Sequence, residues 1–124
     1  MIQKISHFAL PVQYMTESVE FYRDVIRLPP FKNGKERTSF LISGQTLTLF
    51  LKSNASPSGD GPMIVLETNN LEQEHRRLEK AWVIFKQRPK KEPHGLVASF
   101  LDPNGHIISL IEENSQKWNI SSNL

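Results

Sequence analysis

The order of predicted elements in the first half of the chain returns in the second half, and this repeat constrains the fold more than any other feature. His7-Phe8-Ala9-Leu10 corresponds to Met63-Ile64-Val65-Leu66 at an offset of 56 residues. Ser39-Phe40-Leu41 corresponds to Ser99-Phe100-Leu101 at an offset of 60 residues. Loop insertions produce a drift of this size, so the sequence predicts two similar modules in tandem.

Each module is predicted to contain one helix and several strands. In the first module Thr16 is the predicted helix N-cap, and Pro29-Pro30 prevents the helix from continuing. Alternating apolar residues predict the strands of this module, which are Ile5 to Val12, Arg37 to Ile42 and Thr46 to Leu51. The last two strands are joined tightly through Ser43-Gly44.

The second module follows the same order. Asn70 is the predicted N-cap of a helix whose apolar stripe is Leu71, Leu78 and Trp82, and Gln73 stands three residues after the cap. The predicted strands are Met63 to Glu67, a short one at Val83 to Phe85, Leu96 to Leu101 and His106 to Ile111. The turn Asp102-Pro103-Asn104-Gly105 joins the last two.

With 124 residues the chain is long enough for one globular domain. We expect a single domain over residues 1–113, with module one at 4–52, a linker rich in Pro, Gly and Ser at 53–62, and module two at 63–113. Residues 114–124 form a predicted polar C-terminal tail.

Composition limits the classes of partner. The chain has no cysteine, so disulfides and thiolate ligands are excluded, and the net charge of +2 mildly favours anionic over cationic ligands. Lys86 to Lys91 is the densest basic stretch and is predicted to be a solvated loop. No apolar run predicts a spanning helix or a secretory signal, so we expect a cytoplasmic protein without membrane or nucleic-acid partners.

Two motifs on the duplicated frame resemble a known family. Phe21-Tyr22-Arg23-Asp24-Val25-Ile26 on the first helix and Phe100-Leu101-Asp102-Pro103-Asn104-Gly105 before the last strand resemble the vicinal oxygen chelate superfamily, which includes glyoxalase I, bleomycin resistance proteins and extradiol dioxygenases. The resemblance covers residues 4 to 113. It implies an α+β fold in which two tandem βαβββ modules form an open, cupped mixed sheet, usually completed in a homodimer.

The resemblance also implies where a metal would be held. Metalloenzymes of the superfamily place ligands on the first and last strand of each module, and these positions read His7, Thr48, Met63 and Ser109 here. A catalytic divalent site usually needs about three ligands from His, Asp and Glu. We therefore expect no metal cofactor. A divalent metal held by ligands outside these four positions stays open as an alternative, with Glu67 a weak candidate beside His7.

If the resemblance holds, strand alternation defines a concave face with small-molecule character. The residues expected on this face are His7, Ala9, Thr46, Thr48, Phe50, Met63, Val65, Ile107, Ser109 and Ile111. His94, between Pro93 and Gly95, is expected near the mouth of the pocket. His7 is the candidate acid–base or ligand-orienting group.

Other titratable residues are expected to have structural roles. His75 is predicted to be packed or partly exposed on the second helix, and His106 is predicted to be exposed beside a turn. Alternation places Glu112 on the face opposite Ser109.

The function expected from these features is metal-free binding or sequestration of a neutral or anionic organic ligand, similar to the sequestering resistance proteins of the superfamily. The alternative is a glyoxalase-like or dioxygenase-like enzyme that uses His7, with or without a divalent metal. A third interpretation is an interaction module in which the barrel is only a scaffold.

Overall fold

The computed structural model describes residues 1–53 and 63–114. Most of the predicted linker, and the predicted tail after Asn114, lie outside the described residues. Packing divides the chain into two units. Unit 1 contains the described residues before position 54 together with Asp102–His106, and unit 2 contains the other described residues.

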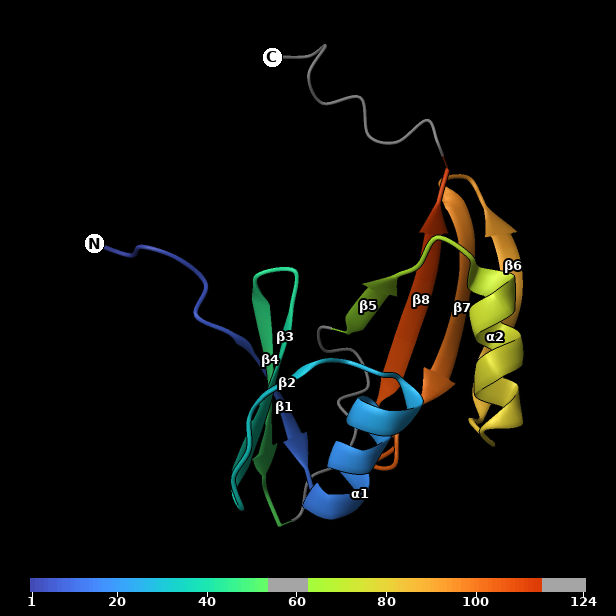
Figure 1. Cartoon of the computed structure of the whole chain (residues 1–124). Helices are drawn as coiled ribbons and strands as arrows, with labels where there is room; N and C mark the ends of the chain where they lie inside the picture. The colour runs from blue at the N-terminus through green and yellow to red at the C-terminus, as the bar shows by residue number, and fades with distance from the viewer. Residues whose placement is uncertain (54–62, 115–124) are drawn as a thin grey trace. The chain divides into compact units, whose positions relative to one another are not determined.

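Unit 1 is a four-stranded mixed sheet with one helical segment (Figure 1). Its elements in chain order are β1 (Phe8–Val12), α1 (Met15–Glu20), a π-helical turn η1 (Phe21–Val25), β2 (Pro30–Lys32), β3 (Arg37–Ile42) and β4 (Gln45–Leu51). The strand order is β1-β4-β3-β2, with β1 parallel to β4 and the other pairs antiparallel. The short strand β2 was not predicted.

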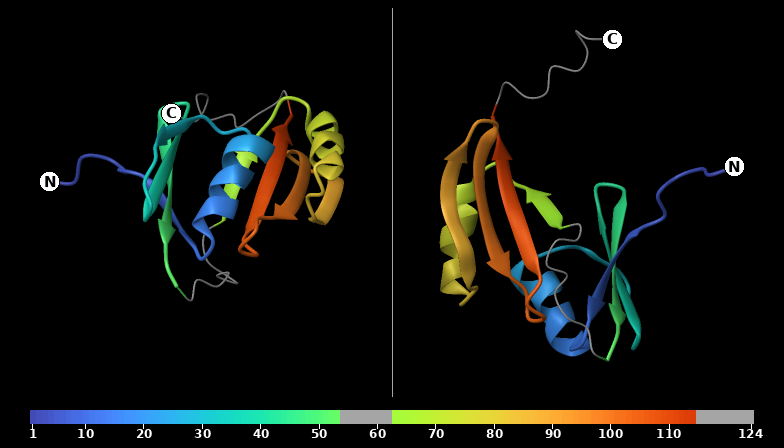
Figure 2. Two further views of the ribbon diagram at one scale, coloured as in Figure 1. Left: turned by 60° about the horizontal axis from the view of Figure 1, so that its bottom comes forward. Right: turned by 180° about the vertical axis from the view of Figure 1, so that it is seen from behind.

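Unit 2 repeats this topology, as the sequence repeat predicts. Its elements are β5 (Ile64–Glu67), α2 (Leu71–Lys80), β6 (Phe85–Glu92), β7 (Gly95–Leu101) and β8 (Ile107–Glu113). The strand order is β5-β8-β7-β6, with β5 parallel to β8. Helix α2 covers one face of this sheet (Figure 2). The tandem βαβββ fold is thus confirmed, as two open mixed sheets.

Each sheet packs its helical segment against one face. In unit 1 the ring of Tyr22 lies 6.2 Å from the ring of Phe40, and both are fully buried. In unit 2 the ring of Phe85 lies 5.6 Å from that of Phe100 and 4.6 Å from that of His75. His75 is therefore packed against an aromatic side chain. The other face of each sheet is free of the unit's own helix, and we call it the open face.

The start of the first helix differs from the prediction. The helix begins at Met15 with Tyr14 as N-cap and no side-chain cap, so the prediction of Thr16 as the cap is wrong. The Asn104 side chain takes part in this start, since its Oδ1 accepts a hydrogen bond from Gln13 N at 2.9 Å. Its Nδ2 donates to Ser18 Oγ at 3.0 Å. Sequence-local signals could not reveal a partner about ninety residues away.

The second helix begins as predicted. Asn70 Oδ1 accepts a hydrogen bond from Gln73 N at 3.1 Å, which confirms Asn70 as the N-cap. Leu71 and Leu78 are buried, but Trp82 lies beyond the helix and is 91% exposed, so its assignment to the apolar stripe is wrong.

The basic stretch is a strand rather than a loop. Strand β6 runs through Lys86 to Lys91 and pairs antiparallel with β7 along the outer edge of the sheet. Its register shifts after Phe85 and again after Gln87, and Pro89 lies within the second shift. Bulges and cationic side chains are typical of edge strands, and they conceal a strand from the alternation pattern.

The turn before the last strand packs into unit 1 through a buried carboxylate. Asp102 is 5% exposed, and its Oδ2 accepts a hydrogen bond from the Tyr22 hydroxyl at 2.8 Å. Its Oδ1 accepts from the backbone N–H groups of Asn104 and His106, each at 2.8 Å. Burial raises the pKa of Tyr22 well above its usual value, and the negative charge of Asp102 and the hydrogen bond to it raise this pKa further.

His106 is buried, so the prediction of an exposed side chain is wrong. Its Nε2 lies 2.7 Å from the carbonyl oxygen of Pro11, which accepts a hydrogen bond from the ring N–H. This partner is far away in sequence, and the turn motif alone gives no sign of it.

Candidate ligand-binding face

Strand register assigns side chains to the open face of unit 1. Cα partners in adjacent strands project to the same side of a sheet. Thr48 is the partner of both Ala9 and Ser39, and Phe50 is the partner of both Pro11 and Arg37. Thr46, Thr48 and Phe50 therefore lie on this open face.

The two hydroxyls at the centre of this face bind each other. Ser39 Oγ and Thr48 Oγ1 are 2.9 Å apart, Thr48 is buried and Ser39 is half-buried. Their hydrogen bond satisfies one donor and one acceptor within the protein. Ser39 was not among the predicted site residues, although the repeat equates it with Ser99.

A row of polar side chains crosses the open face of unit 2. Gln87 in β6 is the partner of Ser99 in β7, Ser99 is the partner of Ser109 in β8, and Ser109 is the partner of Val65 in β5. Apolar side chains flank this row on both sides. They are Leu101 and Ile107 on one side, and Val97 and Ile111 on the other.

The apolar part of this face is open to water. Val65 is 53% exposed and Met63 is 57% exposed, although both are large apolar side chains. Ser109 Oγ donates a hydrogen bond to Met63 Sδ at 3.6 Å, so two of the predicted site residues are in direct contact. An apolar surface with a few hydrogen-bonding groups is the usual chemistry of a small-molecule site.

His7 lies immediately before β1 and outside the strand. It is exposed, and its Nδ1 lies 3.0 Å from Ser6 Oγ. His7 belongs to unit 1, whereas Met63 and Ser109 belong to unit 2.

The four residues that the resemblance assigns to metal ligands, His7, Thr48, Met63 and Ser109, form a donor set that suits a divalent ion poorly. Two of the four are hydroxyls and one is a thioether, which compete poorly with water for hard or borderline cations. Thr48 shares its hydroxyl with Ser39, and Ser109 directs its hydroxyl to Met63. Within residues 1–53 and 63–114, moreover, no three His, Cys, Asp or Glu side chains form a group that could hold a metal.

Glu112 and Glu67 lie on opposite faces of the unit 2 sheet. Glu112 is on the helix-covered side of the sheet, opposite Ser109 as predicted, and its Oε1 accepts a hydrogen bond from Leu71 N at 2.8 Å. A carboxylate there also interacts favourably with the positive end of the helix dipole. Glu67 is the partner of Ile111 and lies on the open face at the end of β5.

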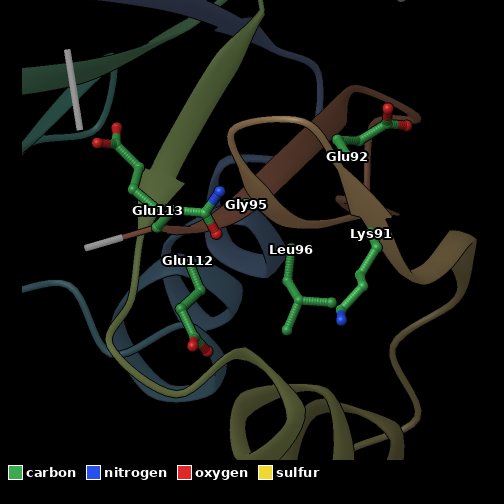
Figure 3. Close-up of a pocket in the computed structure, with 7 residues that line it drawn as sticks. Lys91, Glu92, Gly95, Leu96, Glu112 and Glu113 are labelled. Atoms are coloured by element: carbon green, nitrogen blue, oxygen red, sulfur yellow. The ribbon is translucent and has the colours of Figure 1, made fainter. Parts of the chain in front are cut away.

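A cleft of about 420 Å³ lies at one end of the unit 2 sheet (Figure 3). Its lining residues are Lys91, Glu92, Gly95, Leu96, Glu112, Glu113 and Asn114. The carboxylates of Glu92, Glu112 and Glu113 point away from one another, so they do not form a common binding site. None of the residues of the polar row lines this cleft.

His94 lies in the turn between β6 and β7, beside this cleft. Its side chain is exposed, and its carbonyl oxygen accepts a hydrogen bond from Asn114 N at 3.0 Å. The structure places His94 in the β6–β7 turn, and its position near the mouth of the pocket stays a prediction.

Comparison with known structures shows the same fold at low sequence identity. TnmS3, an antibiotic-binding protein from a Streptomyces species, superposes with a TM-score of 0.73 at 20% identity, covering 91% of this chain and 98% of that chain. A variant of the fosfomycin resistance protein FosX from Listeria monocytogenes, in complex with Mn(II) and a dihydroxypropylphosphonic acid, gives a TM-score of 0.74 at 20% identity, covering 94% of each chain.

A third relative is a glyoxalase-related enzyme from Fulvimarina pelagi, with a TM-score of 0.74 at 20% identity over 89% of this chain and 88% of that chain. No curated protein sequence matches the chain. Within the described part of the chain, no helix has the length and apolar character needed to cross a bilayer. The family profile matches residues 4–110, so the chain belongs to the Glyoxalase/Bleomycin resistance protein/Dioxygenase superfamily.

Proposed function

We propose that the protein binds or sequesters a neutral or anionic organic molecule on its open sheet faces, as a homodimer and without the catalytic metal of the superfamily's metalloenzymes. The observation that carries this proposal is the hydrogen bond from Ser109 to Met63. It joins two of the four metal-ligand positions through a neutral contact inside an apolar surface. Such a surface suits an organic ligand better than a cation.

Charged side chains of both signs lie on the open faces. The face of unit 1 carries Arg37, which favours an anionic ligand, whereas the face of unit 2 carries Glu67 and Glu113 as well as Lys90. Arg37 is the partner of Phe50 in unit 1, and Lys90 is the partner of Val97 in unit 2, so each open face carries a cation. Lys90 Nζ also lies 3.6 Å from Glu92 Oε1, which moderates its charge. A carboxylate or phosphonate beside an apolar body would gain a charge-assisted hydrogen bond at either position.

The structural relatives support the class of ligand. One of them is an antibiotic-binding protein, and another is a fosfomycin resistance protein crystallised with both Mn(II) and a phosphonic acid. Since the identities are near 20%, they support a class of ligand and not a particular compound.

The test uses three aromatic probes of equal size and different charge, namely 2-naphthoate, 2-naphthalenemethanol and 2-naphthylmethylamine. We expect the anionic and neutral probes to raise the melting temperature and the cationic probe to have no effect. Ser109→Ala should weaken binding, while Lys35→Gln in the β2–β3 loop serves as a matched surface control. Equal stabilisation by all three probes, or by none, would contradict the proposal.

The enzyme alternative makes a different prediction for the same experiment. An enzyme that uses His7 would convert a probe or a glyoxalase-type hemithioacetal, and His7→Ala would abolish the conversion. We expect no conversion and only a modest loss of binding in His7→Ala, because His7 lies outside β1 and contacts Ser6. Product analysis by mass spectrometry distinguishes the two outcomes.

A further inference from the structure

Trp82 follows helix α2 with a backbone conformation that is unfavourable for a bulky side chain. Val83 N donates to Leu78 O at 3.1 Å and Trp82 N donates to Glu79 O at 3.0 Å. These are the two hydrogen bonds of a Schellman motif, in which the residue with positive φ is usually Gly or Asn. Trp82 has a φ of 67° and is 91% exposed, so a bulky side chain adopts a strained conformation in contact with water.

Ile84 is a second exposed apolar side chain, two residues after Trp82. It is 66% exposed, whereas Phe85, the next residue, packs against Phe100. Trp82 and Ile84 thus project outward where the chain enters β6. Single exposed apolar side chains are common on protein surfaces. Two neighbouring ones, of which one has a strained backbone, indicate an interaction site more strongly.

The adjoining strand concentrates the positive charge of the protein. Residues 80–91 contain no Asp or Glu, and they include five cations, namely Lys80, Lys86, Arg88, Lys90 and Lys91. Since the whole chain carries +2, the remaining residues carry −3. The Arg88 side chain is 78% exposed and lies 3.5 Å from the Glu79 carboxylate, and that of Lys90 is 61% exposed and lies 3.6 Å from the Glu92 carboxylate. Lys80, Lys86 and Lys91 have no ion pair of this kind among the described residues. Strand β6 is the outer strand of its sheet (Figure 1), so four of these cations belong to an edge strand, and the fifth, Lys80, is the last residue of α2.

This combination fits one class of partner best. A peptide that added to β6 as a further strand would meet two register shifts and Pro89, which interrupt the edge. Single-stranded nucleic acid binds by stacking successive bases on aromatic side chains, and here Trp82 offers a ring for stacking whereas Ile84 does not. The interface of an anionic bilayer accepts indole, aliphatic and cationic side chains together.

We propose that Trp82, Ile84 and the cations of residues 80–91 form a peripheral docking surface for anionic lipid bilayers, which we call the basic edge. This inference goes beyond the proposed ligand binding and does not depend on it. It also departs from the expectation that no membrane is a partner, because the sequence pattern did not reveal that the basic stretch is an edge strand next to an exposed Trp82.

The experiment measures binding of the full chain to phosphatidylcholine vesicles with and without phosphatidylglycerol. Trp118→Phe leaves Trp82 as the single tryptophan, so its emission reports on this site. We expect co-sedimentation only with anionic vesicles, a blue shift of Trp82 emission on binding, and reversal of both by high salt.

Trp82→Gly is the decisive variant, measured by co-sedimentation. Glycine suits the positive φ of this position, so the variant should melt at the same temperature as the parent or higher. Its vesicle binding should nevertheless fall severalfold or be lost. Lys86→Gln should weaken binding about fivefold, whereas the matched surface control Lys35→Gln should have a much smaller effect.

Four results would overturn the inference. They are equal binding to neutral and anionic vesicles, absence of binding to both, unchanged vesicle binding by Trp82→Gly, and tighter binding of oligothymidylate than of anionic vesicles. Size-exclusion chromatography with light scattering on the lipid-free protein adds a fifth. A dimer that dissociates in Trp82→Gly would assign this surface to a second copy of the chain instead.

Discussion

The two sheets carry a pair of hydroxyl side chains at equivalent places, but the pairs are used differently. In unit 1 Ser39 and Thr48 are register partners and form a hydrogen bond of 2.9 Å. In unit 2 Ser99 and Ser109 are register partners as well, but Ser109 directs its hydroxyl to Met63. Within residues 63–114, Ser99 Oγ is left with hydrogen-bonding capacity toward the open face.

The residue that precedes the first strand of each module accounts for this difference. Met63 stands where His7 stands in the first module. Its flexible thioether accepts a hydrogen bond from Ser109, whereas the imidazole of His7 contacts Ser6 outside the strand. The same strand arrangement therefore holds two hydroxyls that bond each other in unit 1 and two that do not bond each other in unit 2. We therefore expect ligand contacts to concentrate in unit 2.

The largest effect is expected from the turn that packs into unit 1. Asp102→Ala would leave the Tyr22 hydroxyl and two backbone N–H groups without their buried acceptor. Each unsatisfied group costs about 1–3 kcal/mol, so we expect a loss of about 3 kcal/mol or more in the free energy of unfolding. Urea denaturation measures this loss, and hydrogen exchange should rise first in β1 and η1. Pro103→Ala, in the same turn, serves as the control, and equal effects of the two substitutions would contradict the assignment.

Tyr22→Phe separates the hydroxyl from the rest of this cluster. It should cost about 1–2 kcal/mol at neutral pH, since it removes one buried charge-assisted hydrogen bond. The pKa of Tyr22 is raised in the folded state, so its contribution is fully present below pH about 10 and is lost as the pH rises above that value. The alkaline fall in stability should be steeper in the parent than in Tyr22→Phe. Parallel stability–pH curves would show that the bond to Asp102 has no such role.

The two helix starts provide a matched pair. Asn70→Ala removes the side-chain acceptor for Gln73 N and should cost about 1 kcal/mol. Thr16→Ala should change stability by no more than a few tenths of a kcal/mol, because Thr16 is not a cap. Thermal melting of both variants checks the pair, and a larger cost for Thr16→Ala would reverse our assignment of the two starts.

The smallest effects concern the two hydroxyl pairs themselves. Thr48→Val removes the bond to Ser39 and should lower the free energy of unfolding by about 0.5–1 kcal/mol with little effect on probe binding. Ser109→Ala removes only the weak bond to the thioether, so we expect a few tenths of a kcal/mol and a clear loss of 2-naphthoate binding. The reverse pattern would place the ligand in unit 1.

The fold was predictable because its signals are local. Alternation and the offset repeat predicted β3, β5 and β7 within one residue of their observed bounds, and Asn70 was recognised as a cap from Gln73. Strand β6 was predicted as a short strand at Val83 to Phe85, of which only Phe85 belongs to the observed strand, because the bulges of β6 and Pro89 break the alternation. The start of the first helix and the burial of His106 were missed because they involve Asn104 and Pro11, which are distant in sequence.

The candidate site was predictable only in part, for a related reason. Alternation assigned Thr48 and Ser109 to a face, but it could not show that their hydroxyls bind Ser39 and Met63. Ser39 and Ser99 could have been found, since they occupy equivalent positions of the repeat. Gln87 could not, because the bulge in β6 sets its register with Ser99.

The measurement that tests the central claim most directly is metal analysis of untagged protein, together with melting curves in Mn, Fe(II), Co, Ni and Zn. We predict no stoichiometric metal and no melting shift for the parent chain, whereas Met63→His combined with Ser109→Glu should acquire metal binding. Stoichiometric metal in the parent would contradict the account, as would stabilisation near the roughly 4 kcal/mol expected for a specific ion at about 1,000 times its Kd.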